Sequence, residues 1–247
     1  MRKLILFATT ALLVLGMSAC VEVNLGKGGK KLKPSENVVK NEYKMEAFTK
    51  IDIDVVAKVK FEQSQDGDYR VVLQAPENYV ELFEFKVEED ELEVGFKERN
   101  VSIESANVGM VIYAPTLQKL ENNGVANIHI DSLSTQQLKV ENDGVGTMKL
   151  KGLKLQSIEV ESGGVGNIEL SGQTERATLE CNGVGNIDAV NLKAVAVKAV
   201  VNGVGGIDCH ASERLKGDVN GVGSLKYSGQ PKEKQLHKNG VGKISEL

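Results

Sequence analysis

Four glutamates at near-constant spacing are the side chains of this sequence that could do chemistry together. They are Glu121, Glu141, Glu161 and Glu180. Lys119 and Lys139 stand two residues before the first two of them. If the fold stacks these positions, the carboxylates form an acidic ridge that could hold a cation, act on a sugar or bind a partner. The simpler alternative is a solvated face, because opposite charges two residues apart screen the stacked like charges.

Other residues with catalytic or metal-binding potential are scattered. His129, His210 and His237 lie at three different positions of the repeat described below, and no histidine–cysteine cluster has metal-ligand spacing. Residues 163–169 resemble a calcium-binding nonapeptide, but Ile168 occupies the position of the aspartate. The sequence therefore predicts no metal, no cofactor and no catalytic set.

Two cysteines of the second half, Cys181 and Cys209, also fall at different repeat positions. An exported protein permits a disulfide between them. Because they would not stack in one column, we expect two buried, small apolar residues instead.

The N-terminus has the features of an export signal. Arg2 and Lys3 precede an apolar stretch, residues 4–15, that is too short to span a bilayer comfortably. Residues 17–20, Met-Ser-Ala-Cys, resemble the cleavage site of bacterial lipoproteins. That resemblance implies cleavage before Cys20 and fatty acyl chains, such as palmitate, on the cysteine. Val21 follows the cysteine where inner-membrane retention would need aspartate, which points to the outer membrane.

The charge composition of the chain limits the classes of partner that are expected. Without residues 1–19 the chain keeps 28 basic and 34 acidic residues, because only Arg2 and Lys3 are lost. A mildly acidic chain argues against nucleic acid as a partner. Residues 20–45 are rich in glycine and lysine and predict a flexible tether, whose lysines either contact anionic lipid or are merely solvated.

Glycine turns must position the ridge. Seven Gly-Val-Gly turns begin at Gly124, Gly144, Gly164, Gly183, Gly203, Gly221 and Gly240, and only the first varies, with Ala126 as its third residue. A fixed period near 20 residues indicates a solenoid whose coils bury their apolar faces against each other. Asn, Asp or Gly precedes each turn, which predicts a sharp turn with positive φ. The valine between two glycines is expected to point inward at a corner.

Apolar residues alternate with polar ones on both sides of each turn, as in a strand with one buried face. A meander of hairpins is the competing fold, because Asn-Gly is also a hairpin signal. The same residue types recur in the same column, which parallel stacking favours. We therefore expect an all-β protein, a β-solenoid, most simply a right-handed parallel β-helix with coils of about 20 residues.

The segment before the repeats continues the same pattern less regularly. Residues 56–61 align with residues 125–130, which predicts a further coil in register with the first turn. Pro76 could begin a short helical turn. Most aromatic residues lie in this segment, where they are expected to close the first coils against edge-to-edge association.

The phrase Asn-Gly-Val-Gly-Asn-Ile-Asp at residues 182–188 resembles the family of autotransporter adhesin heads, or GIN domain. Gly166-Asn167-Ile168 repeats the signature, and residues 48–53 and 114–120 are similar to that family as well. The resemblance covers residues 46–247. It implies a β-helix similar to that of pectin lyases but without a recognised catalytic set, and a role in adhesion.

The chain is therefore expected to have three parts: a signal at 1–19, a lipidated cysteine and tether at 20–45, and a solenoid at 46–247. The solenoid divides into irregular coils at 46–120 and regular repeats at 121–247. We expect a non-enzymatic lipoprotein of the cell envelope that binds a protein or glycan. The alternative is a carbohydrate-active enzyme on the acidic ridge.

Overall fold

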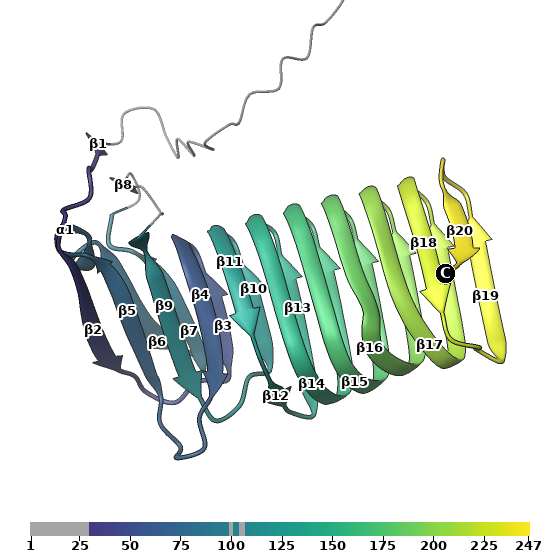
Figure 1. Cartoon of the computed structure of the whole chain (residues 1–247), viewed down its shortest axis with the longest axis horizontal. Helices are drawn as coiled ribbons and strands as arrows, with labels where there is room; N and C mark the ends of the chain where they lie inside the picture. Colours follow the sequence, from purple (N-terminus) through teal and green to yellow (C-terminus); the bar gives the residue numbers. More distant parts are fainter. Residues whose placement is uncertain (1–29, 99–100, 104–106) are drawn as a thin grey trace, which may run out of the picture.

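The computed structural model describes residues 30–98, 101–103 and 107–247 (Figure 1). These residues form strands β1 to β20 and one short helix, α1 (Glu77–Val80). No helix in this part of the chain is long and apolar enough to cross a membrane. Cys20 and the signal segment lie outside the described residues, so their processing stays a prediction.

Each regular coil is a nearly continuous strand that runs round the molecule (Figure 1). The four longest strands are β14 (Val145–Ser162), β15 (Val165–Cys181), β16 (Val184–Val201) and β17 (Val204–Val219). Each pairs in parallel with the next, so that Val165 lies beside both Val145 and Val184. Parallel pairing at an offset of one repeat is a solenoid and not a meander of hairpins, which confirms the predicted fold class.

Shorter strands form the coils on either side of these four. Before them come β10 (Lys119–Asn122), β11 (Val125–Ile130), β12 (Leu133–Ser134) and β13 (Gln137–Asn142). After them come β18 (Val222–Ser228), β19 (Glu233–Lys238) and β20 (Lys243–Glu246). The parallel register continues through all of them.

The coil before the first glycine turn is built from β3 (Lys50–Ile53) and β4 (Val56–Gln63). Val56 pairs with Val125 and Phe61 with Ile130, which confirms the register predicted from the sequence. Between β4 and β10 the chain makes an excursion from the repeat pattern, and it returns to the coil beside β3 and β4 at β10 and β11.

That excursion builds an N-terminal cap together with β2 (Val38–Lys44). Its other strands are β5 (Arg70–Pro76), β6 (Phe83–Glu88), β7 (Glu91–Phe96) and β9 (Gly109–Ala114), and α1 follows Pro76 as predicted. β5 lies antiparallel between β2 and β9, while β9 pairs in parallel with β4. One solenoid face therefore continues as a single sheet onto the cap.

The rest of the cap covers the neighbouring face. β7 pairs in parallel with β3 and antiparallel with β6. β1 (Lys30–Lys31) and β8 (Val101–Ser102) form a small separate sheet. Phe48, Phe61 and Tyr79 are among the largest fully buried side chains, in keeping with the predicted aromatic closure of the first coils.

The prediction of a flexible tether as far as residue 45 is wrong for residues 38–44. They form β2, which pairs with β5 along its whole length. Val39 and Tyr43 are partly buried against the core, whereas Val38, Lys40 and Lys44 are exposed. The inward-facing residues of β2 are too few and too polar for the sequence to distinguish this strand from the lysine-rich segment before it.

The turn glycines are required by close contact between coils. A Cβ on Gly183 would lie 2.1 Å from the carbonyl oxygen of Gly164 in the preceding coil. The predicted positive φ before each turn is wrong, because Glu89 and Asp90 are the non-glycine residues with positive φ in the described chain. In several turns the second glycine has this conformation, as at Gly166 with φ 148°.

The valine between the glycines faces solvent, which corrects its predicted inward orientation. Val165, Val184, Val204 and Val222 are 50, 52, 56 and 57 % exposed. The two glycines press their backbone against the preceding coil, and the side chain between them points the other way, as alternate residues of a strand do.

Asparagine side chains join successive coils in two columns. Inside the solenoid, Asn122 Nδ2 donates to Asn142 Oδ1 at 2.7 Å, and both residues are fully buried. Outside it, Asn202 Nδ2 donates to Asn182 Oδ1 at 2.8 Å, and Asn220 Nδ2 donates to Asn202 Oδ1 at 2.9 Å. Such ladders form because parallel stacking places identical amides one strand spacing apart.

Candidate binding surfaces

The four glutamates do stack in one column, which we name the glutamate ridge: Glu121, Glu141, Glu161 and Glu180. Asp52 of β3 pairs with Glu121, and Glu93 of β7 pairs with Asp52. The acidic column therefore extends across the first coil onto the cap. Val200 follows Glu180 in register and ends the run of carboxylates.

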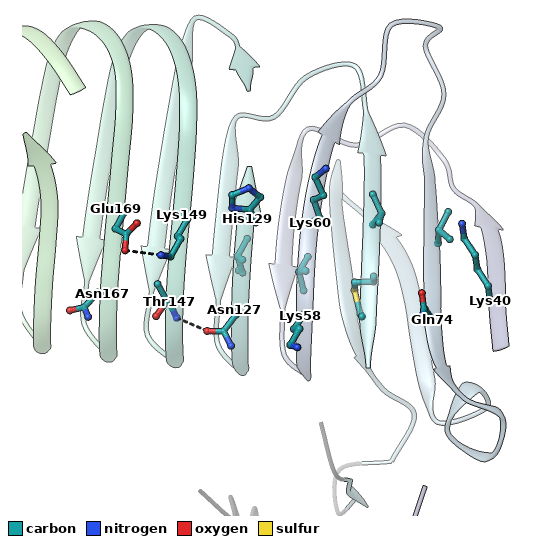
Figure 2. Close-up of a pocket in the computed structure, with 16 residues that line it drawn as sticks. Lys40, Lys58, Lys60, Gln74, Asn127, His129, Thr147, Lys149, Asn167 and Glu169 are labelled. Atoms are coloured by element: carbon teal, nitrogen blue, oxygen red, sulfur yellow. Dashed lines mark hydrogen bonds and ion pairs between the residues drawn. The ribbon is translucent and has the colours of Figure 1, made fainter. Parts of the chain in front are cut away.

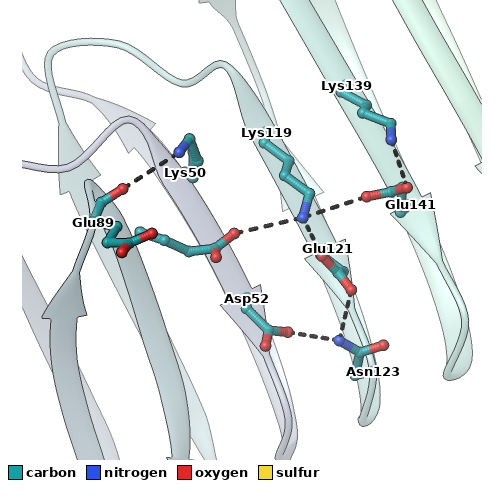
Figure 3. A network of polar contacts seen from close by, with 9 residues as sticks. Lys50, Asp52, Glu89, Lys119, Glu121, Asn123, Lys139 and Glu141 are labelled. Atoms are coloured by element: carbon teal, nitrogen blue, oxygen red, sulfur yellow. Dashed lines mark hydrogen bonds and ion pairs between the residues drawn. The ribbon is translucent and has the colours of Figure 1, made fainter.

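Lysines balance the N-terminal half of the glutamate ridge (Figure 3). Lys119 Nζ contacts the carboxylate of Glu121 and lies 3.4 Å from Glu141 Oε2 and 3.6 Å from Glu91 Oε1. Lys139 Nζ lies 2.7 Å from Glu141 Oε1. The hydrogen bond to Glu121, ahead of the opposing effect of burial, raises the pKa of Lys119, which stays charged at neutral pH.

The C-terminal half of the glutamate ridge is paired with amides instead. Asn182 Nδ2 donates to Glu161 Oε1 at 3.0 Å, and Asn202 Nδ2 donates to Glu180 Oε1 at 3.3 Å. Amides carry no charge, and within the described residues no lysine or arginine forms an ion pair with Glu161 or Glu180. Among the described residues, no group of three or more histidines, cysteines and carboxylates is placed to hold a metal ion.

Asp52 is the carboxyl group with the most altered acidity in this column. Burial raises its pKa to about 6, repulsion from Glu121 and Glu91 adds to that, and a hydrogen bond from Asn123 opposes it. Burial alone would also raise the pKa of Glu121. Hydrogen bonds from Lys119 and Asn123 outweigh that effect, so its pKa lies below the usual value.

The remaining residues singled out in the sequence do not gather into a site. The seven turn glycines line one corner, and their role is the contact between coils. His129, His210 and His237 lie on separate coils. Cys181 and Cys209 are buried free thiols in different columns, and burial raises the pKa of both, to about 12 for Cys209.

A hollow that the sequence did not reveal lies where the solenoid face passes onto the cap (Figure 2). Its volume is about 670 Å³, within the range of small-ligand sites. We name it the lysine trough, after the residues Lys40, Lys58, Lys60 and Lys149 on its lining. It shares no residue with the glutamate ridge.

Two of these lysines already have carboxylate partners. Lys60 Nζ lies 2.8 Å from Glu62 Oε1 and 3.1 Å from Asp131 Oδ2, and Lys149 Nζ lies 3.0 Å from Glu169 Oε1.

The other two, Lys40 and Lys58, are exposed. No carboxylate in the described part of the chain pairs with either of them. The lysine trough therefore carries uncompensated positive charge on a protein whose formal net charge is −4.

The sequence of this chain matches the model of one known family. The family described as putative auto-transporter adhesin, head GIN domain, matches residues 47–231. The chain belongs to this family. No curated protein matches it.

Solved structures agree with the family assignment. A putative adhesin from Bacteroides fragilis is 37 % identical, with a TM-score of 0.85, and the alignment covers 87 % of this chain and all of that one. A putative lipid binding protein from Parabacteroides distasonis (19 % identity, TM-score 0.73, 88 % of this chain and 100 % of that one) shares the fold. A putative adhesin from Parabacteroides merdae also shares the fold, with 20 % identity, a TM-score of 0.68, and coverage of 88 % of this chain and 99 % of that one.

Proposed function

We propose that this protein is an exported, lipid-anchored adhesin that binds a partner along one face of its solenoid without chemical turnover. The observation that carries the proposal is the glutamate ridge, in which one type of side chain recurs on four successive coils. Coils lie about 4.8 Å apart, so the ridge offers equal contacts at regular intervals to an extended partner. Repeated weak contacts on a cell surface gain strength through multivalency. Membership of an adhesin family supports the same role.

The ridge is tested by replacing Glu121, Glu141, Glu161 and Glu180 with glutamine in the full chain. Partners would be sought on glycan arrays and among cell-envelope proteins. We expect folding to persist and binding, or its salt dependence, to change, because charge is removed while shape is kept. The ridge pair Glu161→Gln/Glu180→Gln is compared with a control of equal charge change, Glu175→Gln/Glu246→Gln, at exposed glutamates away from the ridge. Equal effects of the two variants would contradict the proposal.

The anchor is tested by Cys20→Ala. This change should abolish acylation and move the protein from the membrane fraction to the soluble fraction, because stable anchoring needs the acyl chains. Mass spectrometry of the unaltered protein should show a modified Cys20 at a new N-terminus. A mature chain that still contains residues 1–19 with an unmodified Cys20 would refute the lipoprotein assignment.

One observation favours the enzymatic alternative. Asp52 and Glu121 lie side by side in register, and their pKa values are displaced in opposite directions. A proton-holding carboxyl beside an ionised one is an arrangement that acid–base catalysis uses. Incubation with acidic polysaccharides and calcium tests this. Release of reducing or unsaturated sugar ends that Asp52→Asn abolishes would make the protein an enzyme, and no release would support the adhesin.

A further inference from the structure

We propose that the lysine trough binds an anionic glycan, and that its ammonium groups contact the carboxylate or sulfate groups of the sugar chain. This site lies on a different face from the glutamate ridge and shares no residue with it. Either proposal can therefore fail without the other.

The shape of the lysine trough comes from the sheet that joins the cap to the solenoid. Strands β2, β5, β9, β4, β11, β14 and β15 follow one another across its floor. On strand β9, between β5 and β4, Gly109 has no side chain, and a Cβ placed there would meet nothing closer than the Lys58 carbonyl oxygen at 3.8 Å. The space above Gly109 is thus open, with Gln74 beside it on β5 and Lys58 beside it on β4.

The positive charge of the lysines around this space favours an anionic ligand. Lys58 lies on the solenoid side of Gly109, and Lys40 lies on β2 beyond Gln74 (Figure 2). The two lysines lie on either side of Gln74 and Gly109, and neither has a carboxylate partner among the residues described. A ligand carboxylate or sulfate between them would gain charge-assisted hydrogen bonds without breaking an existing ion pair.

Neutral polar groups beside the lysines suit the hydroxyl groups of sugars. Asn127, Thr147 and Asn167 continue the row of Lys58 along the solenoid (Figure 2). The Asn127 Oδ1 atom accepts a hydrogen bond from the Thr147 backbone N–H at 3.1 Å. That bond fixes the amide plane and leaves the Asn127 NH₂ group free to donate to a ligand. Val72 and Val111 supply an apolar floor for the non-polar face of a sugar ring.

Other anionic partners fit this surface less well. The lining has no Phe, Tyr or Trp on which a nucleic-acid base could stack. Strands β5, β9, β4, β11 and β14 of the floor are each paired on both sides, so a peptide could add a strand only at the outer edge of β2 and not within the hollow. A flat bilayer surface cannot follow a hollow, whereas a single glycan chain can lie in it. Successive strands are about 4.8 Å apart, which is close to the length of one pyranose unit.

The experiment measures binding of the full chain to an oligogalacturonate and to a heparin-derived oligosaccharide by calorimetry. The methyl ester of the oligogalacturonate serves as the uncharged probe, and phosphatidylglycerol vesicles as the lipid probe. Lys40→Gln/Lys58→Gln is the test variant. The matched control is Lys198→Gln/Lys216→Gln, two exposed lysines that are neighbours on another face.

We expect at least one of the acidic oligosaccharides to bind, and the test variant to raise its Kd at least about tenfold. The control variant should leave the Kd unchanged, and the methyl ester should not bind. Gly109→Val gives a steric test, because the strand has room for the new side chain but the hollow would be filled. It should weaken binding while the melting temperature stays near that of the unaltered protein.

Four results would contradict the proposal. The first is binding of neither acidic oligosaccharide. The second is equal binding by the test and control variants, which would mean that the charge of the lysine trough is not used. The third is binding of the vesicles alone, lost with Lys40→Gln/Lys58→Gln, which would assign the surface to lipid. Loss of oligosaccharide binding on replacement of the glutamate ridge would also contradict a separate site.

Discussion

Asp52 makes the stability of the protein depend on pH in a direction unusual for a carboxyl group. Its pKa is raised from 3.8 to about 6 in the folded chain, so the folded state binds the proton more tightly than the unfolded state. Stability contributed by the protonated form is present at low pH and is lost as the pH rises from about 4 to about 6. Asp52→Asn should remove that loss.

Thermal unfolding across pH 4 to 8 measures this effect. The melting temperature of Asp52→Asn relative to the unaltered protein should rise between pH 4 and pH 6 and then level off. Asparagine still offers Oδ1 to the Asn123 amide, which now donates to Asp52 at 3.0 Å. Glu175→Gln, an exposed change elsewhere, is the control. A difference that is constant with pH would contradict the raised pKa.

The buried asparagine pair is a second residue-level feature with a measurable energy. Asn142 Nδ2 and Asn122 Oδ1 have no protein partner, so the bond between the two amides is the main compensation for burying them. Asn142→Val should destabilise the fold by about 1–3 kcal/mol, because it leaves the buried Asn122 amide without its hydrogen-bond partner. Val201 and Val219 occupy the same column in later coils, so valine fits there.

The double change Asn122→Val/Asn142→Val should therefore restore most of the lost stability. Denaturant unfolding of both single variants and the double variant completes the cycle. If the two single losses simply add in the double variant, the amides do not depend on each other and the interpretation is wrong.

At the scale of the coil, glycine is needed where backbone meets backbone. Gly183→Val should cost more than about 2 kcal/mol, since even its Cβ would overlap the Gly164 carbonyl oxygen of the preceding coil. Lys198→Ala, on an exposed position of the same coil, should cost less than about 0.5 kcal/mol. Similar losses in melting temperature for the two variants would show that the contact between coils at Gly183 does not determine the stability of the fold.

Columns of like residues could be predicted from the sequence because parallel stacking repeats at the period of the turns. The register of residues 56–61 against residues 125–130 followed from the same rule and is confirmed. The direction of each turn valine could not be predicted in this way. It depends on which backbone atoms of the preceding coil lie under Gly164 and Gly166. The repeat pattern of the sequence contains no information about these contacts.

The whole molecule shows why the lysine trough escaped prediction. Lys40, Gln74 and Gly109 lie on β2, β5 and β9, outside the repeats. Their neighbours are set by antiparallel pairings that join distant parts of the chain. No periodic signal links these residues to Lys58, whereas the four glutamates of the ridge recur at the period of the turns and could be identified from the sequence. The irregular strands of the cap bring together polar residues whose proximity cannot be read from the repeats of the sequence.

The cap also predicts where the folded unit begins. A chain that starts at residue 46 lacks β2 and leaves one edge of β5 unpaired. Compared with a chain that starts at residue 30, it should melt at a lower temperature and self-associate, because an open strand edge pairs with other chains. Light scattering after size-exclusion chromatography measures the association. Two monomeric chains with equal melting temperatures would mean that β2 is dispensable.

The register that β14 to β17 share at their glycine turns makes the solenoid adjustable in length. Each coil meets the next through the same Gly-Val-Gly backbone contact, so a duplicated coil between β16 and β17 would find suitable neighbours on both sides. Such a duplication would carry β18 to β20 about 4.8 Å further from the cap and leave the lysine trough untouched. The distance between the two ends of the molecule can thus change by whole coils while the chemistry at the cap stays constant.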